Sequence, residues 1–292
     1  MKAPPFAYVR PATLDDVLAE LAGGDAKVLA GGQSLVPVLA MRLGRPATLV
    51  DINSVADLHG LAAVSGALRV GAAVRQRTVE RADAARAVPL IGMALPFVGH
   101  RELRSRGTVV GSLAHADPAA ELPAVAACLE ATIEVAGPSG RRSVPAAAFF
   151  TGAMTTGAGP DEIVVAVAFP TARPGEGFGF AEIARRHGDF ALAGVATRVR
   201  VDADGITDAR LTGFGISDRP VSRDVTALVQ AAGEREPELR VATAELATEV
   251  VDTAGDAHGS TGYRRRLFGV LAARELARAV RHARRSSEED PT

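Results

Sequence analysis

The sequence predicts an α+β fold with at least two domains. Within residues 1–56, a predicted helix is followed by a strand, a glycine loop, a helical turn and a second strand, the pattern of a small α/β unit. Segment 171–177, TARPGEG, is rich in proline and glycine and has no hydrophobic periodicity, which indicates a domain boundary. An alternating segment with an Asp-Ala-Asp-Gly turn follows, and helical stretches come after it, so the C-terminal domain is also predicted to be α+β.

The first subdomain, residues 1–56, is predicted to open with a helix. Thr13 is placed to cap it, Asp16 follows three residues later, and apolar residues recur at helical spacing over 14–21. AKVLAGG reads as a short buried strand that runs into a glycine loop. LVPVLAMRLG then reads as a helical turn with Pro37 near its start, and ATLVDIN as a second strand.

The second subdomain is predicted over residues 57–173 and the C-terminal domain over residues 177–285. In the second subdomain, ALRVGAAV, ATIEVAGPSGRRSVP and EIVVAVAFP read as strands, with helical pieces in QRTVERA and AVPLIGMALPFV. The C-terminal domain is predicted to contain a hairpin in LAGVATRVRVDADGITDARLTGFG. A long closing helix with one apolar stripe follows, and residues 286–292 are predicted to form a polar tail.

Composition excludes several classes of function. A chain of 292 residues with 47% hydrophobic residues can bury two cores, and its formal net charge of -1 gives no reason to expect a nucleic-acid partner. No apolar run approaches the roughly 20 residues that cross a bilayer, and the N-terminus lacks an uninterrupted apolar core. We therefore expect a cytoplasmic protein with no membrane span.

Metal and nucleophile chemistry are also disfavoured. The single cysteine, Cys128, lies in the apolar run PAVAACLEA and cannot alone hold an iron-sulfur cluster or a thiolate zinc site. The six histidines lack ligand spacing, so no metal site is expected. The motifs GxxxxGK[ST], GxGxxG after the first strand, and GxSxG are all missing.

Two glycine-bearing segments are the candidate sites. In LAGGQSL, the loop can adopt positive φ and offer successive N–H groups to a phosphate, with Gln33 and Ser34 as uncharged donors. Alternatively, Gly31 and Gly32 only turn the chain. In GTVVGSLAHADPAAELP, hydroxyl groups and a glycine precede two carboxylates, which could accept hydrogen bonds from a ribose diol or simply cap the following helix, expected to begin near position 123.

Five ordered segments carry a resemblance across nearly the whole chain: LAGGQSLVPVLAMRLGRPATLVDIN, GTVVGSLAHADPAAELPA, FFTGAMTTGAGPDEIV, FAEIARRHGDFALAGVA and YRRRLFGVLAARELARA. Together they resemble the FAD-binding medium subunits of molybdenum hydroxylases, a group that includes carbon monoxide dehydrogenase and xanthine dehydrogenase. The resemblance implies a vanillyl-alcohol-oxidase-type FAD-binding domain of two α/β subdomains with the flavin between them. It also implies a smaller C-terminal α+β domain.

The resemblance also implies site residues. Those around the FAD pyrophosphate would be Ala30, Gly31, Gly32, Gln33, Ser34 and Leu35. A second set of phosphate contacts would come from Thr108, Gly111 and Ser112, and the acidic position that supports the ADP half would be Glu121, with Asp117 next to it. The chain departs from the family pattern at four positions: Ser105 and Ser112 stand where asparagine is common, Val110 where glycine is common, and Glu121 where aspartate is common. If the position of Val110 needs a positive φ, its β-branched side chain would be strained.

The segment RRHGDFALAG is a further candidate. His187 or its neighbours could approach the flavin ring or a subunit interface, while Arg185, Arg186 and Asp189 fix the linker between domains by charge-assisted contacts. The alternative is a solvated charge cluster beside a strand. The YRRR cluster is interpreted as a helix face or a partner contact.

The function implied by the resemblance is electron transfer through FAD. A large molybdopterin subunit would oxidise the substrate, and a small iron-sulfur subunit would pass the electrons to FAD on this chain, which would deliver them to an external acceptor. The complex would be a heterotrimer that dimerises, and no residue of this chain would be catalytic. Two alternatives stay open: an assembly scaffold that binds FAD weakly or not at all, and a free-standing flavin oxidoreductase acting on its own small substrate.

Overall fold

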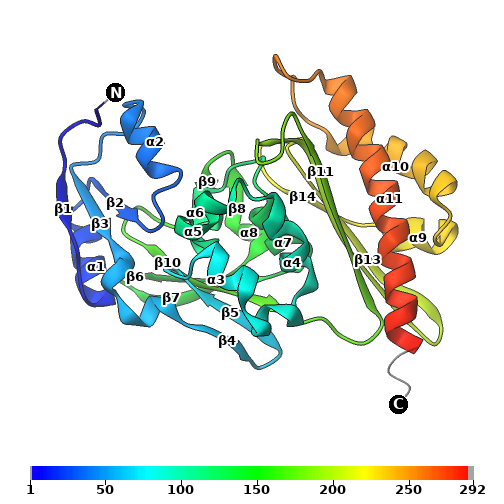
Figure 1. Cartoon of the computed structure of the whole chain (residues 1–292), viewed down its shortest axis with the longest axis horizontal. Helices are drawn as coiled ribbons and strands as arrows, with labels where there is room; N and C mark the ends of the chain where they lie inside the picture. The colour runs from blue at the N-terminus through cyan, green and yellow to red at the C-terminus, as the bar shows by residue number, and fades with distance from the viewer. Residues whose placement is uncertain (1, 289–292) are drawn as a thin grey trace.

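The computed structural model describes residues 2–288, and its elements lie in three consecutive groups along the chain (Figure 1). The helices are α1 Leu14–Ala22, α2 Leu35–Ala40, α3 Gln76–Arg81, α4 Pro89–Ala94, α5 Arg101–Arg106, α6 Val109–His115, α7 Glu121–Cys128, α8 Ala146–Phe149, α9 Thr226–Ala232, α10 Glu236–Val250 and α11 Thr261–Glu288. The strands are β1 Ala7–Val9, β2 Ala26–Leu29, β3 Thr48–Asp51, β4 Leu61–Val64, β5 Ala67–Gly71, β6 Thr132–Gly137, β7 Gly140–Pro145, β8 Phe150–Gly152, β9 Thr155–Thr156, β10 Ile163–Pro170, β11 Glu176–Ala184, β12 Ala191–Asp202, β13 Gly205–Phe214 and β14 Val221–Asp224. Short 3-10 turns, η1 Ile52–Ser54, η2 Ala56–His59, η3 Asp83–Ala87 and η4 Leu95–Phe97, connect them.

The first group is a parallel three-stranded sheet in the order β1-β3-β2. The predicted cap of α1 is confirmed, since the hydroxyl of Thr13 accepts the N–H of Asp16 at 3.2 Å. Helix α1 buries Val17 and Leu21, and β2 runs directly into the glycine loop. The predicted strand, loop, helix and strand are therefore all present, but the prediction that the chain opens with a helix is wrong, because strand β1 precedes α1 and pairs with β3.

The second group surrounds an antiparallel five-stranded sheet in the order β4-β5-β10-β6-β7. Helices α3 to α7 lie between the first and third groups in Figure 1. Most buried apolar side chains of α3, α4, α6 and α7 belong to one large core that also includes residues of α1, β3, β5, β6 and β10. The predicted strands of this region are confirmed, and α7 begins at Glu121, two residues before the expected position.

The third group is an antiparallel sheet in the order β11-β12-β13-β14, covered on one face by α11. Gly177 and Gly179 let the backbone of α11 approach β11, because an added Cβ would overlap the carbonyl oxygens of Ala279 and Glu275. The opposite face carries Phe178, which belongs to the core of the second group. The sheet therefore has one face covered by α11 and one face packed against the core of the second group.

Two features of the third group differ from the sequence interpretation. Strand β11 was not expected, because its glycines mask the alternation of FGFAEI. Helix α11 extends to Glu288, so it includes three residues of the predicted polar tail, 286–292. The remaining tail positions, 289–292, lie outside the described residues.

Candidate functional site

The first glycine loop presents successive unused N–H groups. Within residues 2–288, the backbone N–H groups of Gly31, Gly32, Gln33 and Ser34 donate to no other backbone group. Gly32 has a φ of +73°, a conformation that favours glycine. Ser34 occupies the N-cap position of α2 without a side-chain capping bond, and Leu35 begins the helix. A bare run of donors at a helix start is suited to bind an anionic group.

The carbonyl groups of this loop are already committed. The side-chain amide of Gln33 donates to the carbonyl oxygen of Gly31 at 3.2 Å, and Val36 N–H donates to the carbonyl oxygen of Gly32 at 3.0 Å. Asn53 donates its side-chain amide to the carbonyl oxygen of Ala30 at 2.9 Å. With these acceptors tied down, the polar backbone groups that the loop leaves free are its N–H donors.

The two glycine segments touch each other. A Cβ added at Gly31 would overlap the carbonyl oxygen of Arg106 and lie 2.7 Å from the Cα of Gly107. A Cβ added at Gly111 would lie 3.9 Å from the Cβ of Ala30. Glycine at position 31 is therefore required by backbone contact, and the interpretation that Gly31 and Gly32 only turn the chain is insufficient.

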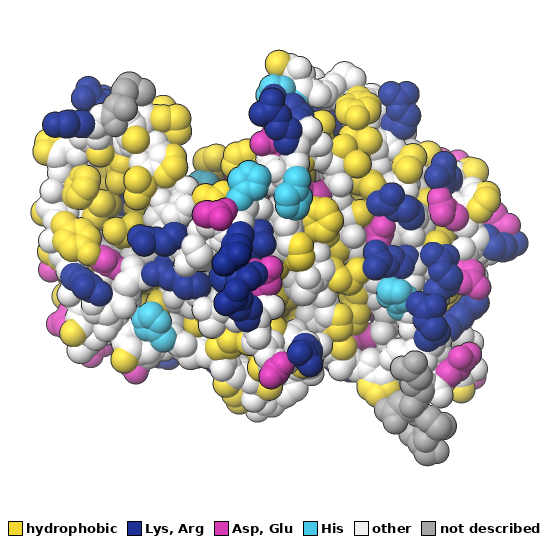
Figure 2. All heavy atoms as spheres, viewed as in Figure 1, with side chains coloured by type: hydrophobic (Ala, Val, Ile, Leu, Met, Phe, Trp, Pro, Cys, Tyr) yellow, Lys and Arg dark blue, Asp and Glu magenta, His cyan; other side chains and the backbone are white. Residues whose placement is uncertain are grey.

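Two side chains that the sequence interpretation missed hold the segments together. Arg75 donates to the carbonyl oxygen of Arg106 and to the side-chain oxygen of Asn53, both at 2.5 Å. Asn53 in turn donates to the carbonyl oxygen of Ala30 in the first loop. One chain of hydrogen bonds therefore runs from Arg106 through Arg75 and Asn53 to that loop. The available signal was that Arg75 directly follows the predicted strand 67–74 and that Asn53 ends the predicted strand 47–53. Figure 2 shows Lys and Arg side chains gathered over α3 and α5, beside this contact.

The second segment forms the start of α6. Thr108 is its N-cap, and the Thr108 hydroxyl accepts the N–H of Gly111 at 2.9 Å. Val109 N–H donates to the carbonyl oxygen of Val74 at 3.3 Å, and Ser112 N–H to that of Thr108 at 3.2 Å. Most backbone N–H groups of this segment thus already donate to acceptors within the protein.

The strain considered at Val110 is not present. Val110 is a helical residue of α6, is 2% exposed, and has no positive φ. Its side chain packs in the large core instead. Valine is accommodated here because the position is helical and inward-facing.

The two acidic candidates lie at the turn between α6 and α7. Asp117 is half-buried and its carboxylate accepts the N–H of Ala119 at 2.8 Å, so it stabilises the turn. Glu121 is the first residue of α7 and is 8% exposed. Burial, with a smaller contribution from the charge of Asp117, raises the pKa of Glu121 to about 7, against the opposing effects of a backbone hydrogen bond and of Arg104. Ala120 is the N-cap of α7 and offers no side-chain capping bond.

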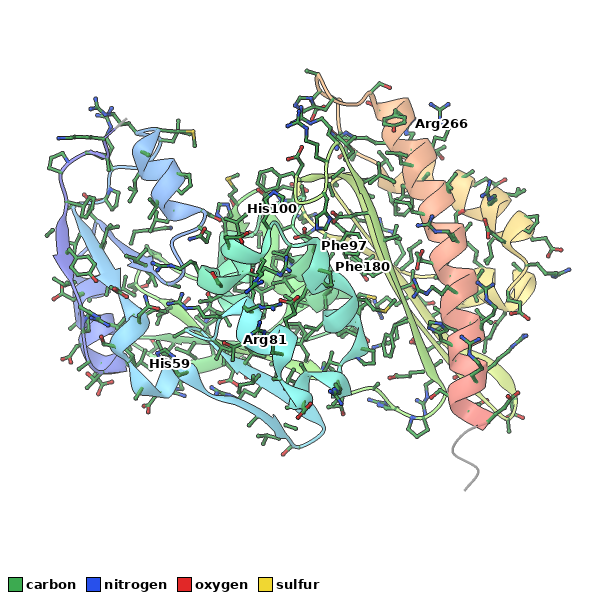
Figure 3. The ribbon with its side chains drawn as sticks, viewed as in Figure 1. His59, Arg81, Phe97, His100, Phe180 and Arg266 are labelled. Atoms are coloured by element: carbon green, nitrogen blue, oxygen red, sulfur yellow. The ribbon has the colours of Figure 1, made fainter. Side chains whose placement is uncertain are left out.

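The segment after β11 lies at the junction of the second and third groups. Phe97 packs against Phe180 with ring centroids 5.3 Å apart, and the His187 ring lies 6.3 Å from that of His100 (Figure 3). Arg185 and Asp189 pair at 3.6 Å but are largely exposed, and Phe190 is 72% exposed. Arg185 and Asp189 thus form an exposed charge pair, as the alternative interpretation of this segment expected.

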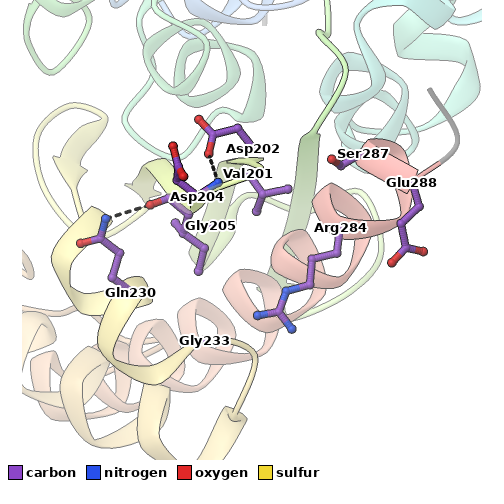
Figure 4. A pocket seen from close by; sticks show the side chains of 10 residues that line it. Val201, Asp202, Asp204, Gly205, Gln230, Gly233, Arg284, Ser287 and Glu288 are labelled. Atoms are coloured by element: carbon purple, nitrogen blue, oxygen red, sulfur yellow. Dashed lines mark hydrogen bonds between the residues drawn. The ribbon is translucent and has the colours of Figure 1, made fainter. Parts of the chain in front are cut away.

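Other parts of the chain offer little for chemistry. Cys128 is fully buried, and burial raises the pKa of its thiol to about 12, so it is not a reactive thiolate. The described residues contain no group of three or more histidine, cysteine or carboxylate side chains that could hold a metal. No helix among them is long and apolar enough to cross a bilayer. A pocket of about 540 Å³ lies far from the glycine loops, between the β12-β13 turn and the end of α11 (Figure 4).

Comparison with known proteins gives a consistent result. A family model described as the FAD binding domain in molybdopterin dehydrogenase matches residues 4–172, and one described as the CO dehydrogenase flavoprotein C-terminal domain matches residues 178–279. The chain is 36% identical to the nicotine 6-hydroxylase medium subunit of Paenarthrobacter nicotinovorans over 285 residues, covering 96% of this chain and 99% of that protein. It is 30% identical to the carbon monoxide dehydrogenase medium chain of Afipia carboxidovorans, covering 96% and 98% respectively.

Solved structures of similar fold belong to the same kind of enzyme as these relatives. Quinoline 2-oxidoreductase from Pseudomonas putida 86 matches with a TM-score of 0.90 at 36% identity, covering 97% of this chain and 99% of that one. Carbon monoxide dehydrogenase from Hydrogenophaga pseudoflava matches with a TM-score of 0.89 at 29% identity, covering 96% and 98%. The likeness therefore extends over nearly the full length of both the sequence and the fold.

Proposed function

This chain belongs to the family of FAD-binding medium subunits of molybdopterin-dependent dehydrogenases, and we propose that it is the electron-transfer subunit of a molybdenum hydroxylase complex. FAD is its cofactor. When bound, FAD accepts electrons singly from iron-sulfur clusters and releases them singly or in pairs. The chain's own contribution is to bind and orient the cofactor.

The observation that carries the proposal is the run of four unused N–H groups at Gly31, Gly32, Gln33 and Ser34. A pyrophosphate accepts many hydrogen bonds, and a nest of backbone N–H groups supplies donors for them. Contact of Gly31 with Arg106 and Gly107 holds this loop against the second segment. The residues fit the pyrophosphate of FAD by their four consecutive N–H groups, which donate to no other backbone group of the described chain.

Further contacts follow from the same arrangement. The Thr108 hydroxyl accepts one bond within α6 and keeps its own proton to donate, and the hydroxyl of Ser112 is half-buried beside it. Ala30 and Leu35 border the donor run on either side. We assign Glu121, with Asp117 beside it, to the ADP half of the cofactor, as carboxyl groups able to accept hydrogen bonds.

The partners in this proposal are a small iron-sulfur subunit and a large molybdopterin subunit, in a cytoplasmic heterotrimer that dimerises. Several relatives are named as medium chains or subunits of larger complexes, which supports this assignment. The proposal places the iron-sulfur clusters and the molybdenum on the partner chains, and the single, buried cysteine of this chain, Cys128, is compatible with that division. The substrate of the complex would bind there too.

The test is reconstitution of the full chain with FAD. Titration followed by the change in flavin fluorescence is expected to saturate at one FAD per chain, and the flavin absorbance should stay with the protein through gel filtration. A chain that retains no flavin would support the scaffold alternative. Purification of the native complex with molybdopterin and iron-sulfur subunits is expected, whereas a flavoprotein that purifies alone and turns over its own substrate would support a free-standing oxidoreductase.

A further inference from the structure

The end of strand β3 lies beside the start of the donor loop, residues 30–35. Strands β2 and β3 run parallel, and Leu29 at the end of β2 is in register with Asp51 at the end of β3. The chain therefore leaves the sheet twice at the same edge, once into the donor loop and once into η1. Asn53 of η1 donates its side-chain amide to the carbonyl oxygen of Ala30 at 2.9 Å, which ties the two exits together.

The carbonyl groups of the donor loop decide where its N–H groups point. In a planar trans peptide, the C=O of one residue and the N–H of the next point in opposite directions. The bond from Asn53 to the carbonyl oxygen of Ala30 therefore turns the N–H of Gly31 away from Asn53. The next two carbonyl groups are held from within residues 30–36, by the Gln33 amide at 3.2 Å and by a helical N–H at 3.0 Å. Only the first of these three peptides is held by a residue from another part of the chain.

The amide of Asn53 fits its surroundings in one orientation. Its nitrogen donates to the carboxylate of Asp51 at 2.5 Å as well as to Ala30, and its oxygen accepts from the guanidinium of Arg75 at 2.5 Å. A carboxylate and a carbonyl oxygen donate no proton and a guanidinium accepts none, so exchanging the amide nitrogen and oxygen would break all three bonds. Asp51 and Arg75 therefore keep the amide nitrogen facing Ala30.

Asp51 is itself held by strand β1. It is 8% exposed, and its carboxylate accepts the backbone N–H of Asn53 at 2.9 Å and the hydroxyl of Tyr8 at 2.5 Å. Tyr8 is in register with Leu49, two residues before Asp51, so the Tyr8 and Asp51 side chains share one face of the sheet. Burial opposes ionisation of Asp51, but the hydrogen bonds from Tyr8 and Asn53 outweigh it and hold the pKa of this carboxyl below its ordinary value.

We propose that Asp51 is a positioning residue of the FAD site and that it acts through Asn53. Tyr8, Asp51 and Asn53 form a relay of hydrogen bonds that holds the carbonyl of Ala30, so that the N–H of Gly31 stays aimed at the pyrophosphate. Rotation of this one peptide would replace a donor by a carbonyl oxygen, which repels a phosphate. This inference rests on the proposed FAD site.

The relay predicts losses of FAD affinity that decrease with distance from the donor loop. Asn53→Asp is nearly isosteric, but its carboxylate would face the carboxylate of Asp51 and the carbonyl of Ala30, so affinity should fall about 30-fold. Asp51→Ala removes the acceptor that orients Asn53, with an expected loss of about tenfold. Tyr8→Phe removes only the outermost bond, from a residue that is half exposed, and should cost about two- to threefold.

Two controls remove the same kinds of group outside the relay. Asp224→Ala removes a carboxylate that, like that of Asp51, accepts the N–H two residues later, here of Thr226 at 2.8 Å. Tyr263→Phe removes the hydroxyl of the other tyrosine of the chain. Both should leave FAD affinity unchanged. Asp51→Asn should recover most of the affinity lost in Asp51→Ala, because an amide oxygen still accepts the N–H groups of Asn53. Urea denaturation without FAD shows that each variant is folded.

Action through Asn53 is tested by combining two substitutions. Asp51→Ala should cost about tenfold in FAD affinity in the wild-type chain but less than about twofold in an Asn53→Ala chain, because the group that it orients is then missing. A purely structural role of Asp51 would lower the free energy of unfolding without this dependence on Asn53. An equal affinity loss in both backgrounds, or a folded Asp51→Ala variant with unchanged affinity, would overturn this inference and leave the proposed function standing.

Competition between ADP and FAD gives a second measurement. ADP carries a pyrophosphate but no flavin, so Asp51→Ala should weaken ADP binding in about the same proportion as FAD binding. A variant that binds ADP as the wild type does while FAD binding is weakened would place the effect away from the pyrophosphate and overturn the inference. Absence of saturable FAD binding to the wild-type chain would overturn both this inference and the proposed function.

Discussion

The two glycine segments of the candidate site have similar composition but use their backbone N–H groups differently. Residues 30–35 expose four N–H groups that no backbone acceptor uses, whereas Val109, Gly111 and Ser112 direct theirs to internal acceptors. Gly32 has a positive φ, while Val110 sits inside a buried helix. Glycine and hydroxyl residues alone therefore do not identify a ligand loop, because what matters is whether the backbone donors are already satisfied.

The difference between the segments predicts unequal effects on FAD binding, and Gly31→Ala should have the largest. Its new Cβ would overlap the backbone at Arg106 and Gly107 and push the donor loop away from its neighbour. We expect affinity to fall by at least about 100-fold, corresponding to about 3 kcal/mol. A titration followed by flavin fluorescence measures this affinity for FAD. Gly92→Ala is the control, because a Cβ there meets no atom within 4 Å and should leave affinity unchanged.

Arg75→Ala should have the next largest effect. It removes the hydrogen bonds to the carbonyl oxygen of Arg106 and to Asn53 that hold the two segments together. With two bonds lost at about 1 kcal/mol each, affinity for FAD should fall about 10- to 30-fold. Arg75→Lys should recover only part of this, since an ammonium cannot reproduce the fork of a guanidinium. If Arg75→Ala bound FAD normally, the segments would not depend on this bridge.

Thr108→Val should lower stability more clearly than affinity. It removes the cap of α6, which costs about 1 kcal/mol in the free energy of unfolding. FAD affinity should fall only a few-fold, because the first loop supplies most of the donors. Urea denaturation and flavin titration of the same variant separate the two quantities. A loss of affinity as large as that of Gly31→Ala would mean that the second segment is an equal partner in binding.

Val110→Gly should have the smallest effect on affinity. It restores the residue common in the family, yet Val110 is buried and helical here, so glycine should lower the free energy of unfolding by about 2 to 3 kcal/mol. FAD affinity should stay within about twofold of wild type when measured well below the unfolding transition. A marked gain in affinity would indicate that Val110 obstructs the site.

Local features were predictable from the sequence, because their causes lie within a few residues of each other. The cap at Thr13, the strand-loop-helix around Gly31, and the hairpin of β12 and β13 all appear as expected. The α+β architecture also followed from these units and from the resemblance. Strand β11 was missed because the glycines that admit α11 weaken its strand pattern, and only the packing partner explains them.

The sequence by itself determined the elements, the domain classes and the family, since these depend on periodicity, turn residues and ordered motifs. The tertiary structure decided which groups meet. Gly31 touches Gly107, and Arg75 reaches Arg106 and Asn53, all across long separations in the chain. Whether a backbone donor is free depends on every neighbour in space, which no local pattern records.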